Sequence, residues 1–296
     1  MYKEKIANYL NRDQKTEELG FDSSRLSYIP EYFSSYVEQE RIPNFVCLVS
    51  RFGEVAHYSH QGFKNTESRE EINNETIFRI YSMTKPITSV AIMMLYERGL
   101  IRLEHELYRY LPEFKNTEVW ETGDINNFKT KPLNNPILIR DLLTHTAGFT
   151  YDFMLGHPAI GLYRKNGLHD YKNIETKEEM NLEVFCNKLS TLPLLFEPGE
   201  KWHYSCSIDI LGRVVEVVSG MKLDAFFREN IFNPLEMLDT GFYVEKDKFD
   251  RFSDCYQTML GSKKKNMTLS HVAGNDEFSK SRNFLSGGGG LCSTIS

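Results

Sequence analysis

The sequence predicts a globular protein of mixed α and β structure, an α/β (α+β) fold. Of its 296 residues, 41% are hydrophobic, 26% charged and 13% aromatic, which is typical of a chain that folds around a core. Apolar residues recur at helical spacing near the start, then in two short runs typical of strands, and again at helical spacing over much of the chain after residue 80.

The first predicted elements are a helix and a β-hairpin. Asp22 can cap a helix whose apolar residues between positions 26 and 37 recur every three or four residues, and Pro43 follows the end of that helix. Residues 45–51 and 55–62 are predicted strands joined by a tight turn that contains Gly53.

The next predicted element is a short extended segment at residues 77–80, which leads into a helix over residues 86–98. This helix is apolar nearly all round, which predicts a central position, and Gly99 is its expected stop. Further helix-length periodic segments, without an internal repeat, lie at residues 139–143, 182–189, 208–219 and 223–230. The chain ends with a glycine loop at residues 287–290 and a predicted helix start.

Charge, hydropathy and cysteine content narrow the class of protein. The net charge of −6 argues against a nucleic-acid partner, because such proteins carry a concentrated basic face. No segment approaches 18 uninterrupted apolar residues, and residues 1–19 lack the apolar core of a signal peptide, so we expect a cytoplasmic protein without a membrane span. The five cysteines are scattered and include no C-x-x-C pair, which favours reduced thiols.

One pair of residues has the spacing that nucleophilic catalysis needs. Ser82 and Lys85 are three residues apart at the start of the predicted helix, so the amine can reach the hydroxyl. A serine hydroxyl is a weak nucleophile until a neighbour takes its proton, and a lysine can take it if burial or nearby cations favour the neutral amine. The same spacing at Ser262 and Lys265 falls in a hydrophilic stretch, which indicates a chance match.

The sequence around Ser82 resembles a known family. Residues 78–88 read Phe-Arg-Ile-Tyr-Ser-Met-Thr-Lys-Pro-Ile-Thr and resemble the nucleophile segment of beta-lactamase-related serine hydrolases, the superfamily of class C beta-lactamases and penicillin-binding proteins. The segment at 142–149, Leu-Leu-Thr-His-Thr-Ala-Gly-Phe, resembles the family's most recognisable signature. Further agreement in order and spacing is found at 96–114, 197–205, 211–216 and 286–294. The nearest resemblance is to family VIII carboxylesterases.

This resemblance implies a beta-lactamase/DD-peptidase-like fold, in which helices flank an antiparallel sheet and a large, mainly helical domain is added. It implies three parts: residues 1–79 in the α/β domain, 80–282 in the helical domain, and 283–296 returning to the α/β domain. The family's third motif, on a sheet-edge strand that supplies an oxyanion donor, would lie downstream of Ser296. We therefore expect the C-terminal sheet strands to be missing and the 296-residue chain alone to be catalytically poor and marginally stable.

The resemblance also implies the residues of the site. Tyr204 matches the tyrosine that shares proton handling with the lysine, so the predicted catalytic residues are Ser82, Lys85 and Tyr204; which of Lys85 and Tyr204 is the main base stays open. Two residues after this tyrosine, where beta-lactamases and penicillin-binding proteins usually have Asn, this chain has Cys206, and a site without that Asn resembles esterases more than lactam-handling enzymes. His145 invites a Ser-His-Asp interpretation, but the histidine that it resembles is structural.

The predicted function is hydrolysis or transfer of small carboxylic esters through an acyl-enzyme, without cofactor or metal. One alternative is a beta-lactamase or D-amino-acid peptidase or carboxypeptidase acting on an amide; another is a non-catalytic binding or scaffold protein that keeps the fold. An α/β-hydrolase is disfavoured because the sequence contains no Gly-x-Ser-x-Gly elbow. The acyl and alcohol groups of the substrate and the oligomeric state stay open.

Overall fold

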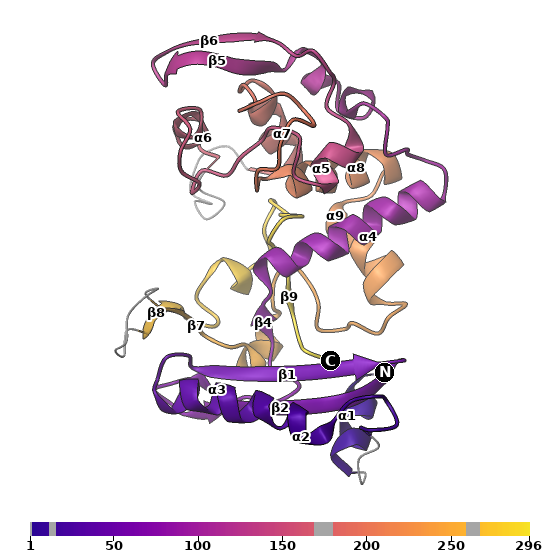
Figure 1. The fold of residues 1–296 in the computed structure, drawn as a ribbon, viewed down its shortest axis with the longest axis vertical. Coiled ribbons are helices and arrows are strands. Elements are labelled where there is room, and N and C mark those ends of the chain that lie inside the picture. Colours follow the sequence, from indigo (N-terminus) through magenta and orange to yellow (C-terminus); the bar gives the residue numbers. More distant parts are fainter. Residues whose placement is uncertain (1, 12–15, 169–179, 259–266) are drawn as a thin grey trace. The chain divides into compact units, whose positions relative to one another are not determined.

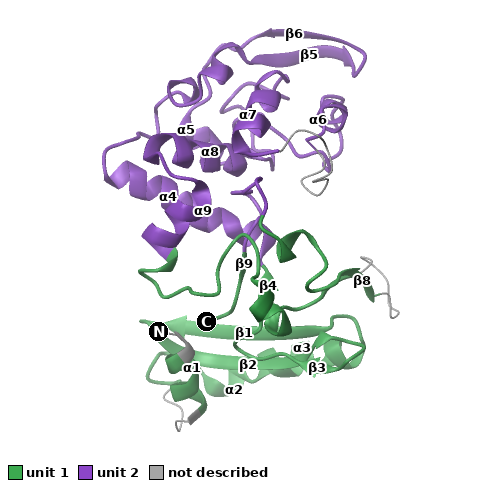
Figure 2. Ribbon diagram, turned by 180° about the vertical axis from the view of Figure 1, so that it is seen from behind, with its two compact units in different colours: residues 1–79, 232–281, 292–296 green, residues 80–231, 282–291 purple. Residues whose placement is uncertain are grey.

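The structure is a computed structural model that describes residues 2–11, 16–168, 180–258 and 267–296. The chain divides into two compact units, shown in different colours in Figure 2. Unit 1 comprises Met1–Arg79, Phe232–Ser281 and Cys292–Ser296, and unit 2 comprises Ile80–Ile231 and Arg282–Leu291. The division made from the sequence placed residues 232–281 in the helical domain, whereas their contacts group them with unit 1.

The sheet of unit 1 is built on the hairpin that the sequence predicts. Strand β1 (Asn44–Arg51) pairs antiparallel with β2 (Glu54–Asn65), and β2 pairs antiparallel with the short β3 (Glu70–Glu71). Phe52 and Gly53 form the connection with φ angles of 53° and 76°. Left-handed values at both positions are typical of the tight turns that match the twist of a hairpin.

Three helices precede or cover this hairpin: α1 (Tyr2–Asn11), α2 (Ser23–Leu26) and α3 (Tyr28–Glu38), of which α1 and α3 pack on β2 (Figure 1). The Asp22 side chain caps α2 by accepting the Arg25 amide, as predicted. The single helix expected here is nevertheless divided at Ser27. A reason for the break is Pro30, which has no amide to donate four residues back and which fits the first turn of a new helix.

The rest of unit 1 consists of short strands and turns. β4 (Phe78–Arg79) pairs antiparallel with β9 (Cys292–Ser293), and β7 (Cys255–Thr258) with β8 (Met267–His271); η5 (Lys246–Arg251) and η6 (Glu277–Ser279) are 3₁₀ turns. The predicted helix start at the chain end is therefore wrong, because residues 292 and 293 are extended and hydrogen-bonded to β4. Arg79 donates to Asp276 at 2.7 Å in a buried ion pair that ties β4 to η6.

Unit 2 is mainly helical. Its helices and turns are η1 (Tyr81–Met83), α4 (Thr84–Glu97), η2 (Leu107–Arg109), η3 (Pro112–Asn116), α5 (Ile139–Leu143), α6 (Ile160–Lys165), α7 (Leu182–Ser190), α8 (Ser207–Ser219), α9 (Leu223–Phe227) and the π-helical turn η4 (Arg228–Phe232), whose last residue belongs to unit 1. Helix α8 packs against α4, α5, α7 and α9 (Figure 1). The core of this unit therefore centres on α8.

Helix α4 is less enclosed than its sequence suggests. Ala91, Ile92 and Leu95 are buried, but Val90 and Met93 are 49% and 42% exposed. The expectation of a helix buried all round is wrong because the elements of unit 2 that pack on α4, chiefly α8, cover one face. The predicted stop is confirmed, since Gly99 follows the helix with a φ of 70°.

Unit 2 also contains a hairpin that was not predicted, formed by β5 (Glu118–Asp124) and β6 (Asn127–Pro132). The Asp124 carboxylate accepts the amides of Asn126 and Asn127 and so closes the turn. Most of its side chains are exposed, so the sequence lacks the alternation of apolar and polar residues by which a half-buried strand is recognised.

Candidate active site

The three predicted site residues converge within unit 2. Ser82 lies in η1, Lys85 in the first turn of α4, and Tyr204 in the segment that leads into α8. The Tyr204 hydroxyl is 2.6 Å from Ser82 Oγ, and Lys85 Nζ donates to the same oxygen at 3.3 Å. One exposed hydroxyl thus has two proton-carrying partners within reach.

The backbone around Ser82 is held from both sides. Tyr81 has a φ of 41°, an uncommon conformation for a residue with a side chain, at the point where the chain turns from β4 into η1. Next to this turn, the Ile80 amide donates to the Leu291 carbonyl at 3.0 Å, and the Leu291 amide donates to Thr84 Oγ1 at 3.1 Å. These bonds fix the nucleophile segment to the residues that follow the glycine loop.

Lys85 is held between the nucleophile and the glycine loop. Its half-buried amine donates to the Gly288 carbonyl at 2.5 Å as well as to Ser82. It also lies 4.8 Å from the ring centroid of Tyr204 and 5.4 Å from that of Tyr151, where aromatic faces attract a cation. These contacts orient the amine toward Ser82.

His145 adjoins Tyr204, with ring centroids 5.0 Å apart, and it is hydrogen-bonded to the residues on either side of Tyr204. Nδ1 of His145 is 3.2 Å from Ser205 Oγ, and its carbonyl accepts the His203 amide at 2.9 Å. Burial and, secondarily, the charge of Lys85 lower the pKa of His145 to about 4, so the ring is neutral at pH 7. These contacts position the Tyr204 segment.

The glycine run is explained by close approach to α8. A Cβ on Gly287 would lie 2.8 Å from the Ile208 carbonyl, and one on Gly288 would lie 2.6 Å from Asp209 Oδ2. Both contacts are too short, so glycine is required for the loop to reach the helix.

Asp209, in the first turn of α8, is a residue of this site that sequence reasoning missed. Its carboxylate is buried and accepts the Ser286 hydroxyl at 2.5 Å and the Gly288 amide at 3.0 Å. Burial raises the pKa of Asp209 above its ordinary value, and the two hydrogen bonds and the charge of Lys85 offset only part of this rise. No sequence signal singles out Asp209, because acidic residues are common in the first turn of a helix and α8 also contains Glu216.

Cys206, which replaces the asparagine of lactam-handling enzymes, is buried directly before α8. Burial raises the pKa of its thiol well above the ordinary value, so the group is a neutral thiol at pH 7. Cys47, Cys186 and Cys206 are free thiols. Within the described part of the chain, no group of three or more His, Cys, Asp or Glu side chains is placed to hold a metal ion.

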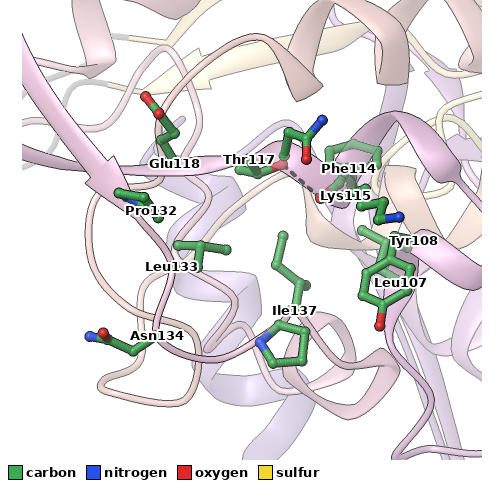
Figure 3. Close-up of a pocket in the computed structure, with 12 residues that line it drawn as sticks. Leu107, Tyr108, Phe114, Lys115, Thr117, Glu118, Pro132, Leu133, Asn134 and Ile137 are labelled. Carbon is green, nitrogen blue, oxygen red and sulfur yellow. Dashed lines mark hydrogen bonds between the residues drawn. The ribbon is translucent and has the colours of Figure 1, made fainter.

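A separate hollow of about 370 Å³ lies elsewhere in unit 2 and does not include the predicted site residues (Figure 3). It is lined by a mixture of apolar and polar residues: Leu107, Tyr108, Phe114, Lys115, Asn116, Thr117, Glu118, Pro132, Leu133, Asn134, Pro136 and Ile137. Figure 3 shows the Thr117 hydroxyl donating to the Phe114 carbonyl, at 3.1 Å, beside this hollow.

Fold and site together define a protein of the serine beta-lactamase and penicillin-binding-protein class. Residues 29–296 match the family model described as Beta-lactamase, and the chain belongs to this family. The solved structure of EstCE1, a hydrolase with promiscuous acyltransferase activity, superposes with a TM-score of 0.73 at 26% identity, covering 94% of this chain and 70% of that one. The predicted fold class is thereby confirmed.

Two curated relatives have named activities. Esterase EstB from Burkholderia gladioli is 33% identical over 218 residues, which is 73% of this chain and 52% of that protein. Acyltransferase mokF from Monascus pilosus is 28% identical over 245 residues, 79% of this chain and 57% of that protein. The chain thus spans about half the length of the curated relatives it matches. In the part of the chain that is described, no helix has the length and apolar character needed to cross a membrane.

Proposed function

We propose that this protein is a serine esterase or ester-transferring enzyme that acts on small carboxylic esters through an acyl-enzyme on Ser82. The observation that carries the proposal is the convergence of two proton-carrying groups on one hydroxyl, with Tyr204 at 2.6 Å and Lys85 at 3.3 Å from Ser82 Oγ. A nucleophilic serine requires such a partner.

The proposed reaction has two halves. Ser82 Oγ attacks the ester carbonyl while its proton passes to the Tyr204–Lys85 pair, and the tetrahedral intermediate collapses as the pair returns that proton to the departing alcohol. Water or a second alcohol then attacks the acyl-Ser82 carbonyl, gives its proton to the same pair, and releases the acid or new ester as Ser82 is reprotonated. The Ser82 amide, near the N-terminus of α4, would donate to the oxyanion.

The preference for esters over lactams has two supports. Cys206 occupies the position where lactam-handling members usually carry asparagine, and its buried thiol is a poor donor. Among the relatives, EstB is named an esterase and mokF an acyltransferase. In the proposed reaction, hydrolysis and acyl transfer both proceed from acyl-Ser82, so one site would serve either water or an alcohol as the acceptor.

A nucleophile test separates the proposal from a non-catalytic scaffold. In the natural protein, Ser82→Ala removes one exposed hydroxyl, so hydrolysis of a short-chain aryl ester should be lost while the unfolding temperature stays unchanged. Ser262→Ala is the control, because Ser262 has the same spacing to a lysine, although it lies outside the described residues. A fluorophosphonate should label Ser82 by peptide mapping, and penicillins should be hydrolysed slowly or not at all. Near-normal turnover by Ser82→Ala would refute the assignment, and rapid penicillin hydrolysis would refute the ester preference.

A further inference from the structure

The buried carboxylate of Asp209 is connected to Lys85 through a single peptide unit of the glycine loop. The Gly288 amide donates to Asp209 Oδ1 at 3.0 Å, and the carbonyl of the same residue accepts from Lys85 Nζ at 2.5 Å. Oδ1 also accepts the Ser286 hydroxyl at 2.5 Å, so the carboxylate binds the loop at two points.

We propose that Asp209 is a positioning residue of the site: by holding Gly288 it places the carbonyl that orients the Lys85 amine toward Ser82. The proposal rests on the proposed function, because it assigns a role in the same reaction. Asp209 acts through the loop and does not contact the reacting oxygen, which lies beyond Lys85 at 3.3 Å from Nζ.

The surroundings of Asp209 favour this role over that of an ordinary helix-start residue. A first-turn acid on a helix is usually exposed, but Asp209 is 1% exposed, and a buried carboxylate is costly unless it is hydrogen-bonded or paired. The one titratable side chain that acts on the pKa of Asp209 is the cation Lys85 from α4, and it lowers that pKa. The Asp209 carboxylate in turn raises the pKa of three neighbouring groups: Tyr151, Cys206, and Cys186 from α7. The carboxylate therefore has a favourable electrostatic interaction with the amine as well as with the loop.

The geometry also explains why the loop has glycine at position 288. Any side chain there would collide with Asp209 Oδ2 at 2.6 Å and with the Tyr151 hydroxyl at 2.9 Å. The loop could not then approach closely enough for its amide to reach Oδ1 and its carbonyl to reach Lys85 at the same time.

The test compares Asp209→Ala with Asp209→Asn on the natural protein. The fraction of molecules with a reactive Ser82 is first titrated with a fluorophosphonate. Because kcat is then calculated per reactive site, molecules that have unfolded do not lower the measured value. Asparagine keeps an oxygen that accepts both hydrogen bonds, so its kcat should stay within about tenfold of the wild type. Alanine frees the loop and should lower kcat about a hundredfold with KM little changed, since small misplacements of catalytic groups have effects of this size.

Asp141→Ala is the matched control. Asp141 is also a buried acid in a unit 2 helix, where it accepts the Leu138 amide at 3.0 Å, and it has no link to Lys85 among the described contacts. Its loss should lower the unfolding temperature but leave kcat per titrated site unchanged.

Unchanged kcat per titrated site in Asp209→Ala would overturn the inference, while loss of activity in Ser82→Ala would leave the proposed function standing. If Asp209→Ala does not fold, Ser286→Ala removes one of the two bonds that hold the loop. It should lower kcat per titrated site about three- to tenfold at constant KM, and an unchanged kcat there would equally refute the positioning role.

Discussion

Replacement of Tyr204 by phenylalanine is the most direct test of the proton path. The change removes the hydroxyl 2.6 Å from Ser82 Oγ and keeps the ring, whose centroid lies 5.0 Å from that of His145 and 5.3 Å from that of Tyr151. Packing is therefore preserved. Lys85 remains, but its 3.3 Å distance is slightly longer than a usual N–H···O bond.

The expected loss follows from this geometry. A positioned acid or base contributes about 10²- to 10⁴-fold to a rate, so kcat in Tyr204→Phe should fall roughly a thousandfold, equivalent to ~4 kcal/mol of transition-state stabilisation. Lys85→Ala should cost a similar factor. The double variant should lose far less than the product of the two factors, because both residues act on one proton of Ser82.

The assay is steady-state hydrolysis of a short-chain aryl ester, with competent sites counted by fluorophosphonate titration and folding checked by thermal unfolding. A Tyr204→Phe variant with more than about a tenth of the wild-type kcat would show that the short hydrogen bond is not part of the proton path, since tenfold corresponds to only ~1.4 kcal/mol. Multiplicative losses in the double variant would show that Lys85 and Tyr204 act at separate steps.

Two further predictions concern stability. Gly148 has a φ of 87°, and a Cβ there would collide with the Phe196 carbonyl, so Gly148→Ala should destabilise the protein by more than about 1 kcal/mol and lower its unfolding temperature by several degrees; an unchanged temperature would refute this. In the folded state the pKa of His145 is lowered to about 4, from 6.5 in the unfolded chain. The neutral ring therefore contributes fully to the free energy of unfolding above pH 6.5, and this contribution is lost as the pH falls toward 4, by at most ~1.4 kcal/mol per pH unit. Chemical denaturation between pH 6.5 and pH 4 should show a decrease in the free energy of unfolding of the wild type and a smaller decrease in His145→Gln.

Several elements that sequence patterns predicted carry a clear periodic signal. The hairpin of β1 and β2 and the helices α5, α7 and α8 carry apolar residues at the spacing of the element, and each was predicted near its observed position. The hairpin of β5 and β6 was not, because its exposed strands give no such pattern. Its turn and its stacked Trp120–Phe128 pair, 4.8 Å between centroids, depend on contacts that periodicity does not encode.

The end of the chain shows how partner-dependent a short segment is. Residues 292 and 293 are extended because they pair with β4, more than two hundred positions earlier in the sequence. A two-residue strand has no period of its own, and a glycine loop is compatible with either a helix or a strand after it. The residues around positions 292 and 293 therefore do not determine whether this segment is helical or extended.

The site residues also differ in how far apart they lie in the sequence. The Ser82–Lys85 spacing is a property of one helix start, and the sequence alone was enough to select it. Tyr204 lies 122 residues from Ser82, and only the family resemblance connected them. Asp209 was overlooked because an acid in the first turn of a helix is common on electrostatic grounds, and nothing in the sequence indicates that this one faces the core.

Helix α8 accounts for how these separated parts reach one geometry. The segment that leads into it carries Tyr204, and its first turn carries Asp209, which binds the loop that holds Lys85. The same helix packs against α4, which contains Lys85, and against α5, α7 and α9. Because one central helix sets the tyrosine directly and the lysine through Gly288, a change that shifts α8 should alter both partners of Ser82 together. Core substitutions on α8 are therefore expected to reduce turnover per titrated site, whereas substitutions in the exposed hairpin of β5 and β6 are not.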